Sequence, residues 1–135
     1  MSVPFVACML LTASVYHLPP RVLPAIHSVE GGKPGVVHLN TDRSEDLGVM
    51  QINTLWIDTL ARYAALPQAV VRDRLVNDPC FNIAAAGLIM RTYLHETKGD
   101  LMLAVGNYHS HTPVLNLSYQ VKVMDAARTM FAARS

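Results

Sequence analysis

The sequence predicts an all-α fold, with five to seven short helices around one core. The chain has 135 residues, which is the length of one domain, and 51% of them are hydrophobic, which is enough to build a core. Apolar residues recur at helical spacing, and no segment shows a convincing β-alternation. We therefore expect a single helical domain over residues 1–135.

The first two predicted helices cover residues 3–16 and 20–30. The first is rich in Ala, Leu and Val, and the pair Pro19-Pro20 ends it and starts the second. Glu30 closes the second helix, and two glycines follow it directly. Residues 31–46 are polar and contain several glycines, so we expect a long surface loop, a kind of segment that often carries function.

The remaining helices are predicted from their boundaries. One begins near residue 54 and a short one follows Pro67. Asp78 as N-cap and Pro79 at the first helical position open a longer helix, which runs to about Glu96. Gly99-Asp100 separates it from a short helix over residues 101–106, and a last helix covers about residues 114–132.

The apolar N-terminal segment, residues 4–15, lacks the positive start and the cleavage site of a signal peptide, and it is too short to span a bilayer. We interpret it as a buried first helix and expect no integral membrane segment. We also expect that an export signal has been removed and that Met1 was supplied for expression. The net charge of +1 and the scattered arginines give no basic stripe, which argues against nucleic acid as a partner.

Glu30 is the strongest candidate for catalysis. Most glutamates at helix ends are solvated, but Glu30 follows apolar residues and precedes two glycines that allow a substrate to approach the backbone. The negative end of the helix dipole and apolar walls favour the protonated carboxyl. Protonating a glycosidic oxygen near neutral pH requires such an acid.

The segment Gly48-Val-Met-Gln-Ile-Asn53 provides polar groups. Gln51 and Asn53 alternate with Met50 and Ile52, so their amides are expected to share one face. Amide side chains both donate and accept hydrogen bonds, which suits the hydroxyl and N-acetyl groups of sugars. Tyr108 fits two interpretations, a half-buried core residue and a residue that lines a cleft.

Metal and cofactor chemistry is not expected. His109 and His111 form a pair, but the sequence has no Cys-x-x-Cys or His-Glu-x-x-His motif, no nucleophile elbow and no phosphate loop. We therefore predict no metal and no cofactor. Cys8 and Cys80 have two interpretations, either buried thiols or a disulfide worth about 2–4 kcal/mol.

Four segments together carry a family resemblance: Ile26-His-Ser-Val-Glu30, Asp46-Leu-Gly-Val-Met-Gln-Ile-Asn53, Asp78-Pro-Cys-Phe-Asn-Ile83 and Ala104-Val-Gly-Asn-Tyr108. In order and rough spacing they resemble soluble-type lytic transglycosylases (glycoside hydrolase family 23). The resemblance covers about residues 8–125, and it is to the small, single-domain members that accompany conjugation, secretion and pilus systems.

The resemblance implies a lysozyme-like helical domain with a sugar cleft. Glu30 matches the single catalytic acid and base, Gln51 matches a sugar-contacting glutamine, and Met50 is expected to pack beneath the cleft. Tyr108 matches a tyrosine near the catalytic glutamate. The expected partners are peptidoglycan glycan strands and proteins of a secretion or conjugation machinery, and we expect a monomer. The resemblance also implies that Cys8 and Cys80 are paired, hence a periplasmic or secreted location.

Two positions depart from the family pattern. Gly31 stands where the family usually has Ser, which is expected to loosen the orientation of Glu30. His109-Ser-His111 replaces Asn-Ala-Gly, which is expected to alter the cleft wall and substrate preference.

The resemblance implies cleavage of the bond from N-acetylmuramic acid to N-acetylglucosamine with formation of a 1,6-anhydro product. A hydrolysing muramidase would need a second carboxylate, for which Asp42 and Asp46 are the candidates. Distantly similar goose-type lysozymes carry Asp where this chain has Asn53, which favours the non-hydrolytic reaction. A non-catalytic peptidoglycan-binding module is a third hypothesis.

Overall fold

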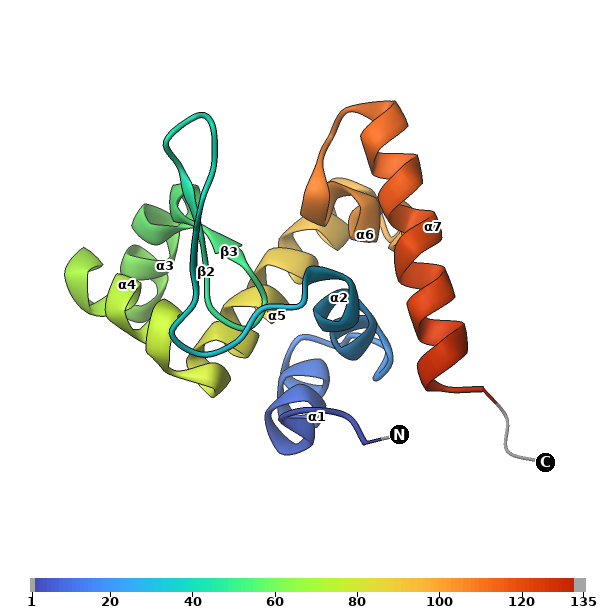
Figure 1. Cartoon of the computed structure of the whole chain (residues 1–135), viewed down its shortest axis with the longest axis horizontal. Helices are drawn as coiled ribbons and strands as arrows, with labels where there is room; N and C mark the ends of the chain where they lie inside the picture. Colours follow the sequence, from blue (N-terminus) through green and yellow to red (C-terminus); the bar gives the residue numbers. More distant parts are fainter. Residues whose placement is uncertain (1, 133–135) are drawn as a thin grey trace.

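The computed structural model describes residues 2–132 and confirms the all-α class. Within these residues, seven α-helices and one short 3-10 helix enclose a single core, and a small antiparallel sheet follows the second helix (Figure 1). The elements are α1 Val6–Val15, α2 Val22–Glu30, β1 Val37–Leu39, β2 Glu45–Leu47, β3 Ile52–Asn53, η1 Thr54–Trp56, α3 Ile57–Ala64, α4 Gln68–Asn77, α5 Pro79–Glu96, α6 Leu101–His109 and α7 Pro113–Met130.

Helix α5 runs through the middle of the molecule and contacts α1, α4 and α6. Figure 1 shows the sheet, α3 and α4 on one side of α5, and α2, α6 and α7 on the other. The start of α5 is as predicted. The Asp78 carboxylate accepts a hydrogen bond from the Phe81 amide, and Pro79 occupies the first helical position. The two sides are therefore held apart on one long helix.

The expectation that no β-structure forms was wrong for residues 37–53. β1 pairs antiparallel with β2, and β2 pairs antiparallel with β3, so that Asp46 lies opposite Asn53. Each strand has only two or three residues, which is too short for period-2 alternation to appear in the sequence. The loop expected over residues 31–46 is thus partly a hairpin.

Helix boundaries also differ from the expectation. α1 begins at Val6 rather than at residue 3, and only three of its residues are buried, so it is not the buried helix that we expected. α2 begins at Val22, two residues later, because Pro20 and Arg21 form a turn before it. α6 continues past Gly106 to His109. Gly106 does not end the helix; a Cβ there would lie 2.0 Å from the Asn116 side chain, so this glycine allows α7 to approach α6 closely.

Asn82 ties the core of α5 to the segment that carries Gln51. Its side chain is fully buried and makes three hydrogen bonds, from Met50 N at 2.8 Å, to Leu47 O at 2.8 Å and to Leu75 O at 2.7 Å. Gly48 lies against this amide with a positive φ of 66°, where a Cβ would collide with Leu75 O at 2.2 Å. The geometry of the Gly48–Gln51 turn is therefore fixed from within the core.

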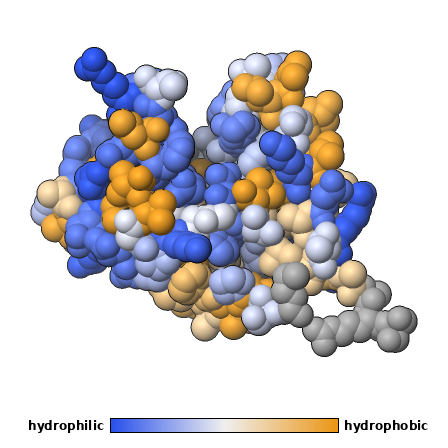
Figure 2. Space-filling model, viewed as in Figure 1, coloured by the Kyte–Doolittle hydropathy of each residue, from blue (hydrophilic) through white to orange (hydrophobic). Residues whose placement is uncertain are grey.

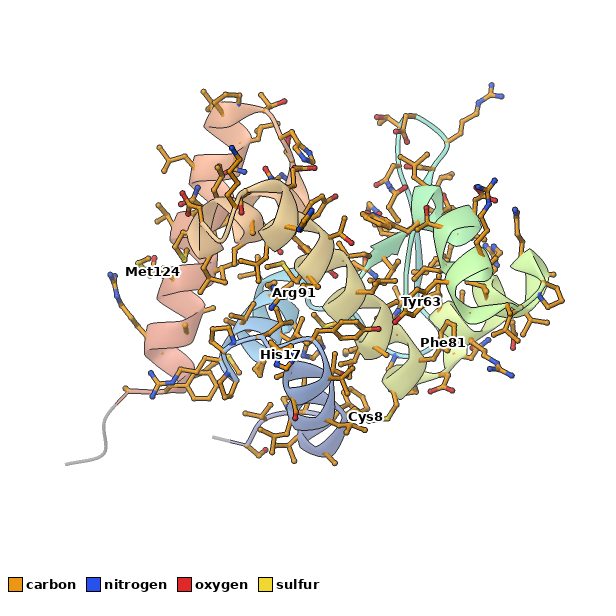
Figure 3. All side chains as sticks on the ribbon, turned by 180° about the vertical axis from the view of Figure 1, so that it is seen from behind. Cys8, His17, Tyr63, Phe81, Arg91 and Met124 are labelled. Carbon is orange, nitrogen blue, oxygen red and sulfur yellow. A yellow bond between two sulfur atoms is a disulfide. The ribbon has the colours of Figure 1, made fainter. Side chains whose placement is uncertain are left out.

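Arg91 and the disulfide attach α1 to α5. The Arg91 guanidinium donates to Tyr16 O at 2.9 Å and to His17 O at 2.8 Å, at the C-terminal end of α1 (Figure 3). At the other end, Cys8 of α1 and Cys80 in the first turn of α5 form the expected disulfide, with their Cα atoms 5.3 Å apart. None of the helices in the described part of the chain is long and apolar enough to cross a membrane.

The double variant Cys8→Ser/Cys80→Ser is expected to lower the free energy of unfolding by about 2–4 kcal/mol, because the bridge restricts the unfolded chain. Urea denaturation followed by circular dichroism measures this difference. Wild type in a strong reductant is the control and should unfold like the variant. Equal stability of the oxidised protein and the variant would contradict the prediction.

Candidate active site

A cleft of about 440 Å³ opens between the two sides of the molecule. Its lining comes from the β1–β2 hairpin, β3 and η1 on one wall, from the end of α2, α6 and the α6–α7 connection on the other, and from α5 between them. Figure 2 shows this face hollowed, with hydrophilic residues around the hollow. An open polar groove of this kind suits an extended hydrophilic chain such as a glycan.

Glu30 lies at the end of α2 and lines the cleft. Gly31 takes a positive φ of 66° and its amide donates to His27 O, which ends the helix at Glu30. A Cβ at Gly32 would lie 2.1 Å from Gly48 O, so the chain after Glu30 runs directly against the Gly48–Gln51 turn. Close backbone packing thus brings the acid and the Gln51 segment to the same cleft.

Tyr119 of α7 holds the Glu30 carboxylate. Its hydroxyl donates to Glu30 Oε2 at 2.5 Å, and its side chain is buried, with 4% exposed. Tyr119 was not among the site residues predicted from the sequence. A usable signal was its place beside Asn116 and Val123 on the buried face of α7, where it is the one aromatic residue. This contact orients the Glu30 carboxyl, for which the Gly31 departure had led us to expect a looser orientation.

The environment of Glu30 favours the protonated form of its carboxyl. Burial raises the pKa of Glu30 above its usual value, and the charge of Asp46 adds to this rise. The Tyr119 hydrogen bond and the charge of Lys122 act in the opposite direction without cancelling it. Partial burial therefore determines the net direction of the shift in the pKa of Glu30.

For the glycan cleavage that the sequence resemblance implies, Tyr119→Phe is expected to lower kcat about tenfold at neutral pH. A hydrogen bond to a charged group is worth about 1.5–3 kcal/mol, and this one also orients the Glu30 carboxyl. Because this bond lowers the pKa of Glu30, its loss should also move the alkaline limb of the pH profile to higher pH. Rates of glycan cleavage measured across pH check both effects. Lower thermal stability with unchanged kcat and pH profile would reduce Tyr119 to a packing residue.

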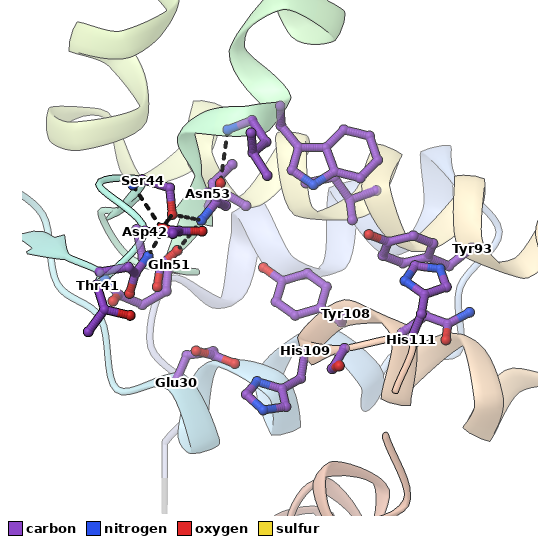
Figure 4. A pocket seen from close by; sticks show the side chains of 18 residues that line it. Glu30, Thr41, Asp42, Ser44, Gln51, Asn53, Tyr93, Tyr108, His109 and His111 are labelled. Carbon is purple, nitrogen blue, oxygen red and sulfur yellow. Dashed lines mark hydrogen bonds between the residues drawn. The ribbon is translucent and has the colours of Figure 1, made fainter. Parts of the chain in front are cut away.

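Tyr108 lines the cleft beside Glu30, as Figure 4 shows. Its hydroxyl donates to Met50 O at 2.7 Å. Burial, followed by the charge of Glu30, raises the pKa of Tyr108 well above its usual value, so the phenol is neutral. The ring thus forms part of the cleft wall while the hydroxyl fastens α6 to the Gly48–Gln51 turn.

The Gly48–Asn53 segment reaches the cleft with only part of its polar groups free. Met50 is fully buried and does not line the cleft, consistent with packing beneath it. Gln51 and Asn53 both line the cleft. Gln51 Nε2 donates to Gly48 O, whereas its Oε1 has no hydrogen-bond partner among residues 2–132.

The side-chain amide of Asn53 makes more hydrogen bonds within the protein than that of Gln51. Its Nδ2 donates to Ser44 Oγ and to Asp46 Oδ1, both at 3.0 Å, and its Oδ1 accepts from Leu55 N at 2.9 Å. The arrangement fits a residue that shapes the hairpin wall of the cleft. Gln51 is therefore the amide with more capacity for a sugar.

Asp42 lies in the hairpin, away from Glu30 in Figure 4. Ser44 donates to Asp42 Oδ1 from its hydroxyl at 2.6 Å and from its amide at 2.9 Å. These hydrogen bonds lower the pKa of Asp42 below its usual value, so this carboxylate is ionised at neutral pH. Asp46 of β2 also lines the cleft.

The opposite wall carries the second departure from the family pattern. His109 stacks on Tyr119, with ring centroids 5.0 Å apart and an angle of 14° between the planes. His111 Nε2 lies 2.6 Å from Glu96 Oε1, which also accepts from Asn107 Nδ2. Both imidazoles line the cleft.

Trp56 and Tyr93 line the cleft between its two walls and were not predicted as cleft residues. Trp56 meets Tyr93 edge to face at 5.9 Å, and Tyr93 meets His111 in the same way at 5.3 Å. This row of three aromatic rings forms only when η1, α5 and the α6–α7 connection come together, so no local spacing in the sequence predicts it. Among residues 2–132, no group of three His, Cys, Asp or Glu side chains could hold a metal ion.

The helical fold and a cleft with one part-buried carboxylic acid define a lysozyme-like domain. Residues 8–117 match the family model described as Transglycosylase SLT domain, and the chain belongs to this family. Both the resemblance found in the sequence and the lysozyme-like fold class are thereby confirmed. The family acts on peptidoglycan as lytic transglycosylases.

Curated relatives include the Invasion protein IagB of two Salmonella typhimurium strains and of Salmonella typhi. Each is 29% identical to this chain over 106 residues, which are 78% of this chain and 62% of the relative. The chain thus matches less than two thirds of the length of these relatives.

Proposed function

We propose that this chain is itself an active lytic transglycosylase. It cleaves the β-1,4 bond from N-acetylmuramic acid to N-acetylglucosamine in peptidoglycan and forms a 1,6-anhydro end. The observation that carries the proposal is Glu30, a carboxyl with a raised pKa that projects into a polar cleft and is held by Tyr119. Membership in the family supports the same reaction.

In the proposed mechanism, protonated Glu30 gives its proton to the glycosidic oxygen, and the bond from this oxygen to C1 of the muramic acid breaks. The substrate's own N-acetyl group stabilises the cation that develops at C1. Ionised Glu30 then removes the proton from the C6 hydroxyl, whose oxygen attacks C1. The nucleophile belongs to the substrate, so its effective concentration is high and one carboxylate serves both steps.

A hydrolysing muramidase is the alternative that one observation favours. Asp42 lines the same cleft with a lowered pKa, as a carboxylate that activates water or stabilises a cation would. However, its carboxylate already accepts two hydrogen bonds from Ser44 on the hairpin. We therefore favour the transglycosylase reaction. Around Glu30, we propose that the substrate is bound by Gln51, Asn53, Tyr108 and Asp42.

The setting that we propose is local opening of the cell wall for a secretion or conjugation machine. The sequence resemblance to secretion- and conjugation-associated members of the family supports this setting, and the relatives named as invasion proteins agree with it. A periplasmic or secreted location agrees with the disulfide, which needs an oxidising compartment, and with a substrate outside the cytoplasm. We further propose that residues 1–135 form one domain that acts as a monomer.

The raised pKa of Glu30 predicts that the contribution of Glu30 to the free energy of unfolding depends on pH. A glutamate in an unfolded chain has a pKa of about 4.3. Above that pH the native state retains the proton longer than the unfolded state, so the stability contribution is greatest at low pH and is lost as pH rises through the native pKa. The free energy of unfolding of Glu30→Gln minus that of wild type should therefore increase as pH rises from about 4 towards neutral.

Denaturant titrations of both proteins at several pH values measure this difference. A difference that stays constant with pH would show that the Glu30 pKa is not raised. Cleavage needs protonated Glu30 at the start, so wild-type activity should fall over the same pH range in which its stability falls.

Digestion of purified sacculi tests the proposed function against a binding module. Wild type is expected to release soluble muropeptides, whereas a binding module would sediment with the sacculi and release none. Sedimentation without release over long incubation would contradict the proposal.

A further inference from the structure

A second cavity shares the catalytic acid with the cleft. It has a volume of about 250 Å³ and lies between the end of α2, the end of α6 and the middle of α7. Glu30 and His109 line both cavities, and Ser118, Tyr119 and Lys122 line this one alone. We call it the side cavity.

The two cavities differ in charge. Both cavities contain the Glu30 carboxyl, and the cleft adds the carboxyls of Asp42 and Asp46, whereas no Lys or Arg lines it. The side cavity contains Lys122, which has neither an ion pair nor a side-chain hydrogen bond within residues 2–132. An anionic group would therefore be disfavoured in the cleft and favoured in the side cavity.

We infer that the side cavity binds a carboxylate of the peptide stem of the glycan strand that is being cleaved. This inference rests on the proposed function. The stem is attached through the lactyl group to the muramic acid ring whose bond is cut, so it must leave the cleft close to Glu30. The side cavity is the polar, cationic opening at that point, with Lys122, the Ser118 hydroxyl and the His109 imidazole as donors.

Binding there would also act on the acid. The groups that face Glu30 are Tyr119 and Lys122 from α7, Tyr108 and His109 from α6, and Asp46 from β2. Lys122 lowers the pKa of Glu30, and a stem carboxylate beside Lys122 would offset that effect. A strand with stems would thus keep Glu30 protonated to higher pH than a bare strand does.

The test compares kcat/KM on glycan strands that carry peptide stems with kcat/KM on strands whose stems an amidase has removed, which leaves only the short lactyl carboxylate on each muramic acid. Wild type should prefer the stem-bearing strand. Lys122→Met should lower this preference about fivefold, which is the upper end of the range for an exposed charge pair. Lys122→Arg should retain it, and so should Lys98→Met, the matched control in the α5–α6 turn that lines neither cavity.

A second reading uses pH. For wild type, the alkaline limb of the pH profile of kcat should lie at higher pH on stem-bearing strands than on stem-free strands. For Lys122→Met, the alkaline limbs measured on the two kinds of strand should coincide. Equal preference in wild type and Lys122→Met would overturn the inference while cleavage itself continues, which leaves the proposed function intact.

A binding measurement separates the two hypotheses if no strand is cleaved. Calorimetry with a stem-bearing muropeptide should give a Kd about fivefold weaker for Lys122→Met than for wild type. The stem-free disaccharide should show a smaller change. Equal Kd values for the stem-bearing ligand would overturn the inference, whereas the absence of cleavage alone would overturn only the proposed function.

Discussion

Glu30→Gln is expected to lower the rate of peptidoglycan cleavage by at least about 10³-fold. In the proposed mechanism one carboxyl serves as acid and as base, and general acid–base catalysis alone contributes about 10²–10⁴-fold. The amide cannot protonate the glycosidic oxygen, and it cannot take the proton from the C6 hydroxyl. It has nearly the shape of the carboxyl and can still accept the Tyr119 hydrogen bond, so the melting temperature should change little at low pH.

The measurement is dye release from labelled sacculi with purified protein. Glu45→Gln is the matched control, because Glu45 pairs with Arg72 on the surface and does not line the cleft. The control should keep wild-type activity. Clearing of sacculi by Glu30→Gln at a rate close to wild type would show that the assignment of Glu30 is wrong.

Asn82→Ala is expected to give the largest loss of stability, about 3–5 kcal/mol in the free energy of unfolding, because it leaves Met50 N, Leu47 O and Leu75 O buried without their partner. The same change frees the Gly48–Gln51 turn, so cleavage should fall even in the fraction that remains folded.

Urea unfolding curves test this prediction. Asn77→Ala is the matched control, because the exposed Asn77 side chain bonds only to Asp73 within α4 and should change stability by less than about 0.5 kcal/mol. A loss below about 1 kcal/mol for Asn82→Ala would mean that the turn is held by other contacts.

The features that the sequence predicted correctly are those with local causes. Asp78 and Pro79 begin α5 through capping chemistry that operates within four residues, and the glycine after Glu30 ends α2 in the same local way. Helical spacing of apolar residues was sufficient for the fold class. These signals place Glu30 at the end of a helix without any knowledge of the other elements.

The missed features depend on contacts between distant segments. Tyr119 reaches Glu30 across 89 residues, through the packing of α7 on α2. Asn53 looked like a free amide, but pairing of β2 with β3 places Ser44 and Asp46 at hydrogen-bond distance from it. The sequence therefore suggested the polar residues of the cleft, whereas the third dimension determines which of their atoms are available to a substrate.

The central claim is that Glu30 catalyses cleavage without water. The most direct test is mass spectrometry of the muropeptides that wild type releases from purified peptidoglycan, with Glu30→Gln digested in parallel. We predict 1,6-anhydro muropeptides from wild type and none from the variant. Reducing muropeptides that contain one added water would contradict this claim and indicate a hydrolase that uses Asp42.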